Sequence, residues 1–175
     1  MTQSADALDP PREPAWSPTA WVMLTAFVLL GSAWFLLPEI PGARGSGNES
    51  AAVGGLKAIA NAQVLFREGD KDRDGTLAYT GSLQQLGSAG PQGEQLIDSV
   101  LAGGVKQGYY FSMGTGRDPR FEFWAKASPT VPGETGDRYF AINMAGILYW
   151  SNHDFPLSDI PERGKLPQGV FEFGN

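Results

Sequence analysis

The longest apolar stretch of the chain runs from Ala20 to Leu37. It contains no charged residue, and a rise of about 1.5 Å per residue would make it a helix of roughly 27 Å, close to the thickness of the hydrocarbon core of a bilayer. The stretch therefore predicts a single transmembrane helix over residues 20–37. Residues 1–19 are rich in proline and acidic side chains, a composition that predicts a disordered leader.

Two other interpretations of the apolar stretch stay open. A cleaved signal peptide would begin with a basic segment and end in small residues, whereas this leader is acidic and the stretch ends in two leucines before Pro38. A core helix of a globular domain would carry polar residues along one side, and Thr25 and Ser32 are the only polar residues in this stretch. A transmembrane helix agrees best with both observations.

The main helix of the folded part is expected after a short linker. Residues 38–47 contain two prolines and several glycines, which predicts a flexible connection. Apolar side chains then recur at spacings of three and four residues as far as Phe66, which is the period of an α-helix. Asn48 is a suitable N-cap, and Glu49 suits the first turn. We therefore expect a helix over residues 48–68.

Gly54 and Gly55 lie in the middle of this predicted helix. Each glycine weakens a helix by roughly 1 kcal/mol relative to alanine. We expect the helix to approach a sheet closely at these positions, because a missing side chain allows two backbones to come together.

From Lys106 onward the period of the apolar pattern changes to two, which is typical of β-strands. Aromatic and aliphatic residues follow this period in the segments 109–113, 121–126, 139–143 and 147–150. The pattern predicts four antiparallel strands joined by short loops. The chain after Trp150 is rich in proline, and we expect residues 151–175 to form an irregular tail packed on the domain.

Composition and charge exclude several classes of function. The chain has 13 basic and 19 acidic residues and a formal net charge of -6 at pH 7, so we expect no nucleic-acid partner, because phosphate binding needs an excess of lysine and arginine. Cysteine is absent, which excludes disulfides, thiolate metal sites and a cysteine nucleophile. His153 is the only histidine, and without a paired nucleophile it is expected to be a residue of the tail and not a general base.

The candidate metal-ligating residues directly follow the predicted main helix. Asp70, Asp72 and Asp74 alternate ahead of Gly75. Calcium loops of the EF-hand type place carboxylates at positions 1, 3 and 5, a glycine at position 6 and a backbone carbonyl ligand at position 7, which here is Thr76. Three carboxylates so close together repel one another unless a cation lies among them. The spacing therefore predicts a Ca²⁺ site.

This predicted site is incomplete. The glutamate expected at position 12 of the loop is replaced by Gly81, so further ligands would have to come from elsewhere, with Glu68 and Asp98 as candidates. The alternative is a solvated acidic turn whose charge is neutralised by Lys71 and Arg73. Both interpretations stay open from the sequence.

Five segments of the predicted domain are similar to one known family. In chain order they read NESAAV over 48–53, LKAIANAQ over 56–63, KQGYYF over 106–111, PTVPGETGDRYF over 129–140 and NMAGILY over 143–149. Together they resemble type IV pilins and pseudopilin-like proteins. The resemblance implies an α+β fold in which a single N-terminal transmembrane helix precedes a pilin-like domain over residues 48–150. In that domain one main helix packs on a four-stranded antiparallel sheet.

The resemblance also implies a place in the cell and a function. We expect a single-pass protein of the cytoplasmic membrane whose C-terminal domain lies outside it and acts as a structural or interaction module, with protein partners in the bacterial cell envelope. One alternative is a minor pilin or pseudopilin of a type IV pilus or type II secretion apparatus, although the apolar stretch lacks the glutamate of pilins. The second is a hydrolase that uses the loop carboxylates, which would need a pocket holding two of them.

Overall fold

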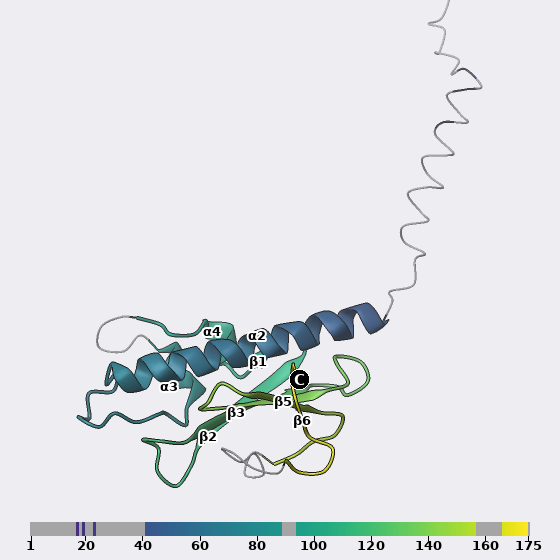
Figure 1. The fold of residues 1–175 in the computed structure, drawn as a ribbon. Helices are drawn as coiled ribbons and strands as arrows, with labels where there is room; N and C mark the ends of the chain where they lie inside the picture. Colours follow the sequence, from purple (N-terminus) through teal and green to yellow (C-terminus); the bar gives the residue numbers. More distant parts are fainter. Residues whose placement is uncertain are drawn as a thin grey trace, which may run out of the picture. The chain divides into compact units, whose positions relative to one another are not determined.

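A computed structural model of the chain describes Ser17, Thr19, Met23 and the ranges 41–88, 94–156 and 166–174. The chain divides into two compact units, Met1–Glu39 and Ile40–Asn175. The helices and strands described below all belong to the second unit (Figure 1). Most of the predicted leader and of the predicted transmembrane stretch lies outside the described residues.

The main helix, α2, spans Pro41–Glu68. Its buried face is formed by Ala52, Leu56, Ile59, Ala62 and Phe66. These residues follow the predicted spacing, and the helix ends at Glu68 as expected. It begins seven residues before Asn48, however, so most of the predicted linker is helical. Proline is tolerated at the first position of a helix because the N–H that it lacks would have no partner there.

Six antiparallel strands form one sheet, and each pairs with its neighbours in the sequence. They are β1 (Val105–Lys106), β2 (Tyr109–Thr115), β3 (Phe123–Pro129), β4 (Tyr139–Asn143), β5 (Leu148–Ser151) and β6 (Phe171–Glu172). The prediction of a four-stranded sheet is therefore wrong. Strands β2 to β5 occupy the predicted segments, and β1 and β6 extend the sheet at its two edges. Each edge strand has only two residues, too few for an alternating pattern to be visible in the sequence.

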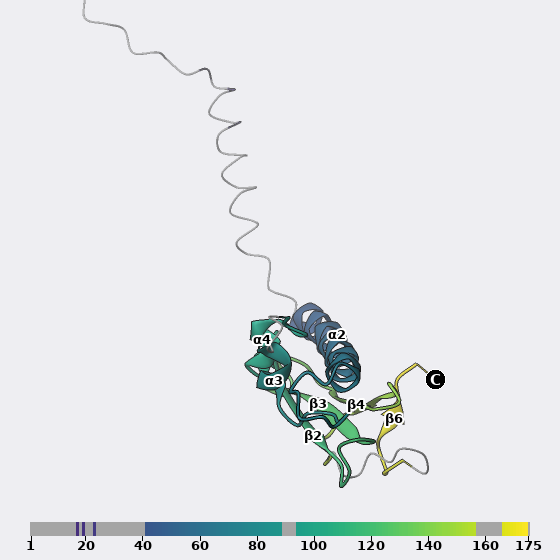
Figure 2. The same cartoon turned by 90° about the vertical axis from the view of Figure 1, so that its left-hand side faces the viewer.

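The helices cover one face of the sheet (Figure 2). On this face α2 is joined by α3 (Leu83–Gly87) and α4 (Ser99–Ala102). The side chains buried between the helices and the sheet include Leu56, Ile59, Leu86, Leu101, Tyr109 and Phe140. Ala141 follows Phe140 and points to the opposite face, where it packs with Tyr149, Phe155 and Val170 in a second, smaller cluster. The C-terminal segment thus covers part of this second face.

Within the described residues, no helix combines the length and the apolar character needed to cross a membrane. Helix α2 has the length, but charged side chains are distributed along it: Arg44, Glu49, Lys57, Arg67 and Glu68. This finding contradicts the prediction of a single-pass transmembrane helix. The predicted location in the cytoplasmic membrane, with the domain displayed outside it, depended on that helix and is therefore also withdrawn. Residues 20–37 lie outside the described residues except for Met23.

The two glycines inside α2 have different surroundings. A Cβ atom at Gly55 would lie 2.7 Å from Cε1 of Phe111, a buried residue of β2. The predicted close approach to the sheet is therefore confirmed at Gly55. A Cβ atom at Gly54 would meet no atom within 4 Å, so packing within the described domain does not require a glycine at this position.

Alanine substitutions at Gly54 and Gly55 should have opposite effects on stability. We expect Gly54→Ala to raise the free energy of unfolding by about 0.5–1 kcal/mol, because alanine loses less backbone freedom in a helix. We expect Gly55→Ala to lower it by about 1–3 kcal/mol, because the added methyl group displaces the buried ring of Phe111. Urea denaturation of both variants beside the wild-type protein measures the two changes. Changes of the same sign would contradict the packing of α2 on β2.

Candidate functional site

The acidic loop, residues 69–79, leaves α2 at its C-terminal end and returns to the same helix. At its start, the N–H of Gly69 donates to the carbonyl oxygen of Leu65 (3.1 Å). At its end, Nε2 of Gln63 donates to the carbonyl oxygen of Thr80 (2.5 Å), and the N–H of Thr80 donates to Oε1 of Gln63 (3.0 Å). Both ends of the acidic loop are therefore fixed on α2.

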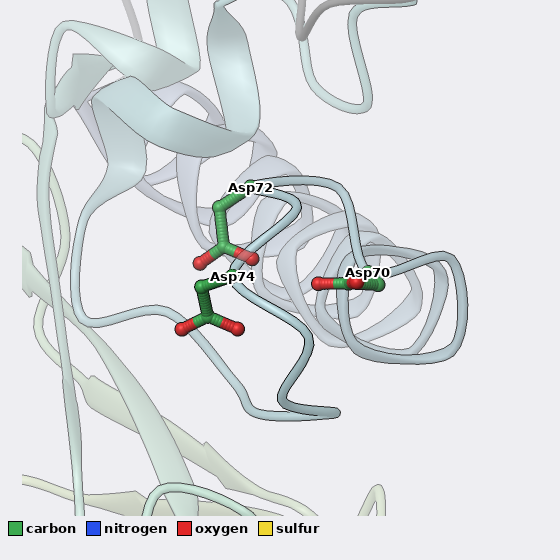
Figure 3. Close-up of side chains that lie close together, drawn as sticks. All are labelled: Asp70, Asp72 and Asp74. Atoms are coloured by element: carbon green, nitrogen blue, oxygen red, sulfur yellow. The ribbon is translucent and has the colours of Figure 1, made fainter.

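Asp70, Asp72 and Asp74 are brought together in the acidic loop (Figure 3). One carboxylate oxygen of each lies within 4.8 Å of the others. The chain turns sharply here, with left-handed backbone at Asp70 (φ 41°), Arg73 (φ 58°) and Gly75 (φ 80°). Glycine adopts this conformation most readily, and Gly75 stands where an EF-hand loop has its glycine. The three predicted carboxylates therefore form one group.

The electrostatics of this group favour a bound cation. Oδ1 of Asp70 is buried and has no hydrogen-bond partner. The pKa of Asp72 is raised, first by partial burial and then by the negative charges of Asp74 and Asp70. The N–H of Thr76 donates to Oδ1 of Asp74 (2.7 Å), which fixes that carboxylate. A cation among the three carboxylates would remove the repulsion and give Asp70 a partner.

Lys71 and Arg73, the counter-charges of the alternative interpretation, form no ion pair with an aspartate of the acidic loop in the described part of the chain. Nζ of Lys71 pairs instead with Oε2 of Glu94 at 2.9 Å.

The two additional donors considered from the sequence do not join the group. Asp98 is the N-cap of α4, where Oδ1 accepts from the N–H of Val100 (3.1 Å) and of Leu101 (3.0 Å). Its Oδ2 accepts from Nζ of Lys106 (2.7 Å), and this bond lowers the pKa of Asp98. Glu68 is exposed and is not part of the carboxylate group found among the described residues. The side-chain ligands thus number three, and the remaining ligands of an ion would be the Thr76 carbonyl oxygen and water.

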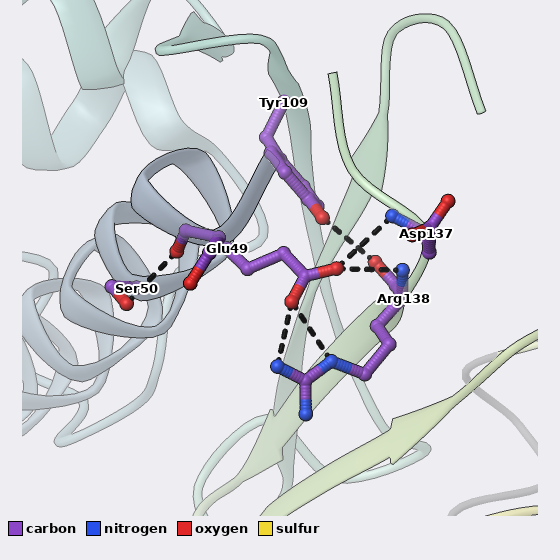
Figure 4. Close-up of polar contacts among 6 residues, drawn as sticks. Glu49, Ser50, Tyr109, Asp137 and Arg138 are labelled. Atoms are coloured by element: carbon purple, nitrogen blue, oxygen red, sulfur yellow. Dashed lines mark hydrogen bonds and ion pairs between the residues drawn. The ribbon is translucent and has the colours of Figure 1, made fainter. Parts of the chain in front are cut away.

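Sequence analysis missed a second polar site, centred on Glu49 (Figure 4). Oε1 of Glu49 accepts from the N–H of Asp137 (3.0 Å) and of Arg138 (3.2 Å). Oε2 accepts from Nε (2.9 Å) and Nη2 (2.6 Å) of Arg138. Burial alone would raise the pKa of Glu49, but these hydrogen bonds and the charge of Arg138 outweigh it and hold the pKa below its ordinary value.

The predicted capping roles of Asn48 and Glu49 are wrong, because α2 begins well before them. Nδ2 of Asn48 donates to the carbonyl oxygen of Thr135 (2.9 Å), beyond the end of β3. Glu49 likewise contacts the chain at the start of β4. Both residues therefore fasten α2 to the sheet instead of ending the helix.

One signal of these contacts is present in the sequence. Glu49 and Gln63 fall on the buried stripe of α2, three residues before Ala52 and four after Ile59. A polar residue on an apolar stripe indicates that it has a partner inside the fold. The sequence does not say which partner, because Arg138 lies 89 residues from Glu49.

Two clefts flank Glu49. The first is lined by Gly45, Ser46, Glu49, Gly133, Glu134, Gly136 and Asp137. The second is lined by Glu49, Ser50, Val53, Arg138, Phe140 and Phe173. Neither cleft contains an aspartate of the acidic loop.

No family model matches the chain, and neither a curated protein nor a solved structure matches it. No family therefore supports the resemblance to pilins and pseudopilins or the calcium site that the sequence suggested. Function is inferred below from the geometry of the acidic loop and from the contacts of Glu49.

Proposed function

We propose that the domain formed by α2 and the sheet is a structural or interaction module without catalytic activity, and that its acidic loop binds Ca²⁺. The observation that carries the proposal is the convergence of the Asp70, Asp72 and Asp74 carboxylates within 4.8 Å. Lys71, one of the two candidate counter-charges in the loop, pairs with Glu94. Carboxylate and carbonyl oxygens are the ligands that Ca²⁺ prefers, and the ion takes about six to eight of them.

The bound ion would act as a cross-link. It would hold the three carboxylates and the Thr76 carbonyl oxygen in one arrangement, and so fix the connection from α2 towards α3. Because the glutamate of position 12 is missing, we expect weak binding, in the range of roughly 10⁻⁴–10⁻³ M that extracellular calcium modules show. The ion supplies no reactive group in this role.

The exposure of the acidic loop argues against the hydrolase alternative. Asp72 and Asp74 are exposed, and neither cleft beside Glu49 contains them. A hydrolase would need two carboxylates held in a pocket, so we do not propose one. The resemblance to pilin-like proteins stays a prediction, and under it the partners of the module would be other proteins.

Calorimetric titration of the full chain with CaCl₂ tests the cation proposal. We expect heat of binding and a rise in melting temperature at millimolar Ca²⁺, and we expect Asp72→Asn to abolish both. Because the pKa of Asp72 is raised, protons should compete with Ca²⁺ for this carboxylate, and binding should weaken as the pH falls towards that pKa.

The matched control is Asp118→Asn, which changes an exposed carboxylate paired with Arg120 and should leave binding intact. If the wild-type protein shows neither heat nor a thermal shift, the acidic loop does not bind Ca²⁺. If Asp72→Asn binds as the wild-type protein does, the ion binds elsewhere.

A further inference from the structure

The carboxylate of Glu49 lies among four hydrogen-bond donors. Two are the consecutive backbone N–H groups of Asp137 and Arg138, and two are Nε and Nη2 of the Arg138 side chain. Paired N–H donors of a guanidinium group are the geometry with which proteins recognise carboxylate ligands. All four donors come from residues 137–138 at the start of β4, and only the acceptor comes from α2.

The donors are held in place without the help of α2. The guanidinium carbon of Arg138 lies 5.4 Å from the ring centroid of Phe140, 5.5 Å from that of Trp150 and 6.0 Å from that of Phe173. The hydroxyl of Tyr109 donates to the carbonyl oxygen of Arg138 (2.9 Å). These contacts come from β2, β4, β5 and the residue after β6. The donor set would therefore keep its shape if Glu49 left it.

The part of α2 that carries Glu49 is fastened by polar contacts and not by the apolar core. Among the described residues, none before Ala52 belongs to either apolar cluster. Two clefts, each lined in part by Glu49, lie beside this part of the helix. Residues 41–51 could therefore move away while Ala52 and the residues after it stay packed.

We propose that Asp137 and Arg138 form a carboxylate-binding site that Glu49 occupies from within the chain, and that an aliphatic carboxylate from another molecule binds there when Glu49 is displaced or removed. The neighbouring cleft supplies an apolar wall from Val53, Phe140 and Phe173, which suits a short alkyl group attached to the carboxylate. This site is separate from the acidic loop and does not depend on cation binding.

Rescue by acetate tests the proposal in the full chain. Glu49→Ala leaves the four donors unpaired and should lower the melting temperature. Sodium acetate, compared with sodium chloride at equal ionic strength, should then raise the melting temperature of Glu49→Ala by roughly 2–4 °C once acetate exceeds its dissociation constant several-fold. Propionate should act at lower concentration, because its extra methyl group reaches the apolar wall.

Two controls accompany the rescue. The wild-type protein should show no difference between acetate and chloride, because Glu49 fills the site, and Glu49→Ala combined with Arg138→Met should lose the difference. Equal melting temperatures of Glu49→Ala in acetate and chloride would overturn the proposal.

Glu49→Gln keeps the test decisive if Glu49→Ala does not fold. Glutamine preserves the shape of the side chain, but its NH₂ group faces donors, so acetate should displace it. We expect faster amide hydrogen exchange over residues 41–51 in acetate than in chloride, with unchanged exchange over residues 56–66. Identical exchange in the two salts would overturn the proposal.

Discussion

Replacing Gln63 with leucine is expected to lower the free energy of unfolding by about 2–4 kcal/mol. Gln63 has none of its surface exposed, and Thr80 is 5% exposed. Leucine would fill a similar volume, but the N–H and carbonyl groups of Thr80 would stay buried without partners. Each buried group left unpaired costs about 1–3 kcal/mol. The loss should therefore exceed that of an ordinary surface substitution.

Urea denaturation followed by tryptophan fluorescence measures this loss. The matched control is Asn61→Leu, which makes the same kind of change two residues earlier, at an exposed position of α2. We expect the control to stay within about 0.5 kcal/mol of the wild-type protein. If the two variants unfold at the same urea concentration, Gln63 does not pair with the backbone of Thr80 in solution.

The second large effect is expected at Arg138. We expect Arg138→Met to lower the free energy of unfolding by about 2–3 kcal/mol, because Glu49 stays buried while losing two charge-assisted hydrogen bonds. The value lies below that of a fully buried ion pair, because the side chain of Arg138 is 35% exposed and solvent screens part of the interaction. Methionine keeps an apolar stem of similar length but removes the guanidinium group, which also lies over the rings of Phe140, Trp150 and Phe173.

The pH dependence of unfolding provides a second readout. The pKa of Glu49 is lower in the folded protein than the ordinary value of 4.5, so the stabilisation is fully present above pH 4.5. As the pH falls below that value, the unfolded chain takes up the proton first, and stability is lost until the folded pKa is passed. In Arg138→Met the burial of Glu49 and its two backbone hydrogen bonds remain, but the side-chain bonds and the charge of Arg138 are gone, so this acid sensitivity should diminish.

Arg120→Met is the control for both measurements at Arg138. Arg120 also forms an ion pair with a carboxylate, and the pair lowers the pKa of Asp118 to about 2. Both side chains are exposed to water, so we expect little change in stability. Equal losses for Arg120→Met and Arg138→Met would contradict a special role for the Glu49 contacts.

The parts of the fold that follow from local periodicity could be predicted from the sequence. Apolar residues recur at every third or fourth position in α2 and at every second position in the central strands, so the sequence itself indicates these elements. The edge strands β1 and β6 could not be predicted, because two residues carry no period. The start of α2 was placed too late, because proline and glycine were interpreted as linker residues although proline also begins helices.

Distance along the chain likewise decides how far the acidic loop and the site at Glu49 could be predicted. Asp70, Asp72 and Asp74 could be identified because all three lie within five consecutive residues, and the turn brings them together. The site at Glu49 could not be identified, because its donors lie 88 and 89 residues away. Only the presence of a charged residue on an apolar stripe indicated it.

The order of the strands also bears on how the chain folds. Each strand pairs with its neighbours in the sequence, so the hairpins from β1 to β5 close short loops and can form early. The contacts of Glu49 close a much longer loop and would form late. Interactions absent from the folding transition state change mainly the unfolding rate. The loss in Arg138→Met should therefore appear in the unfolding limb of a chevron plot, and Glu49 would govern how long the domain stays folded more than how fast it folds.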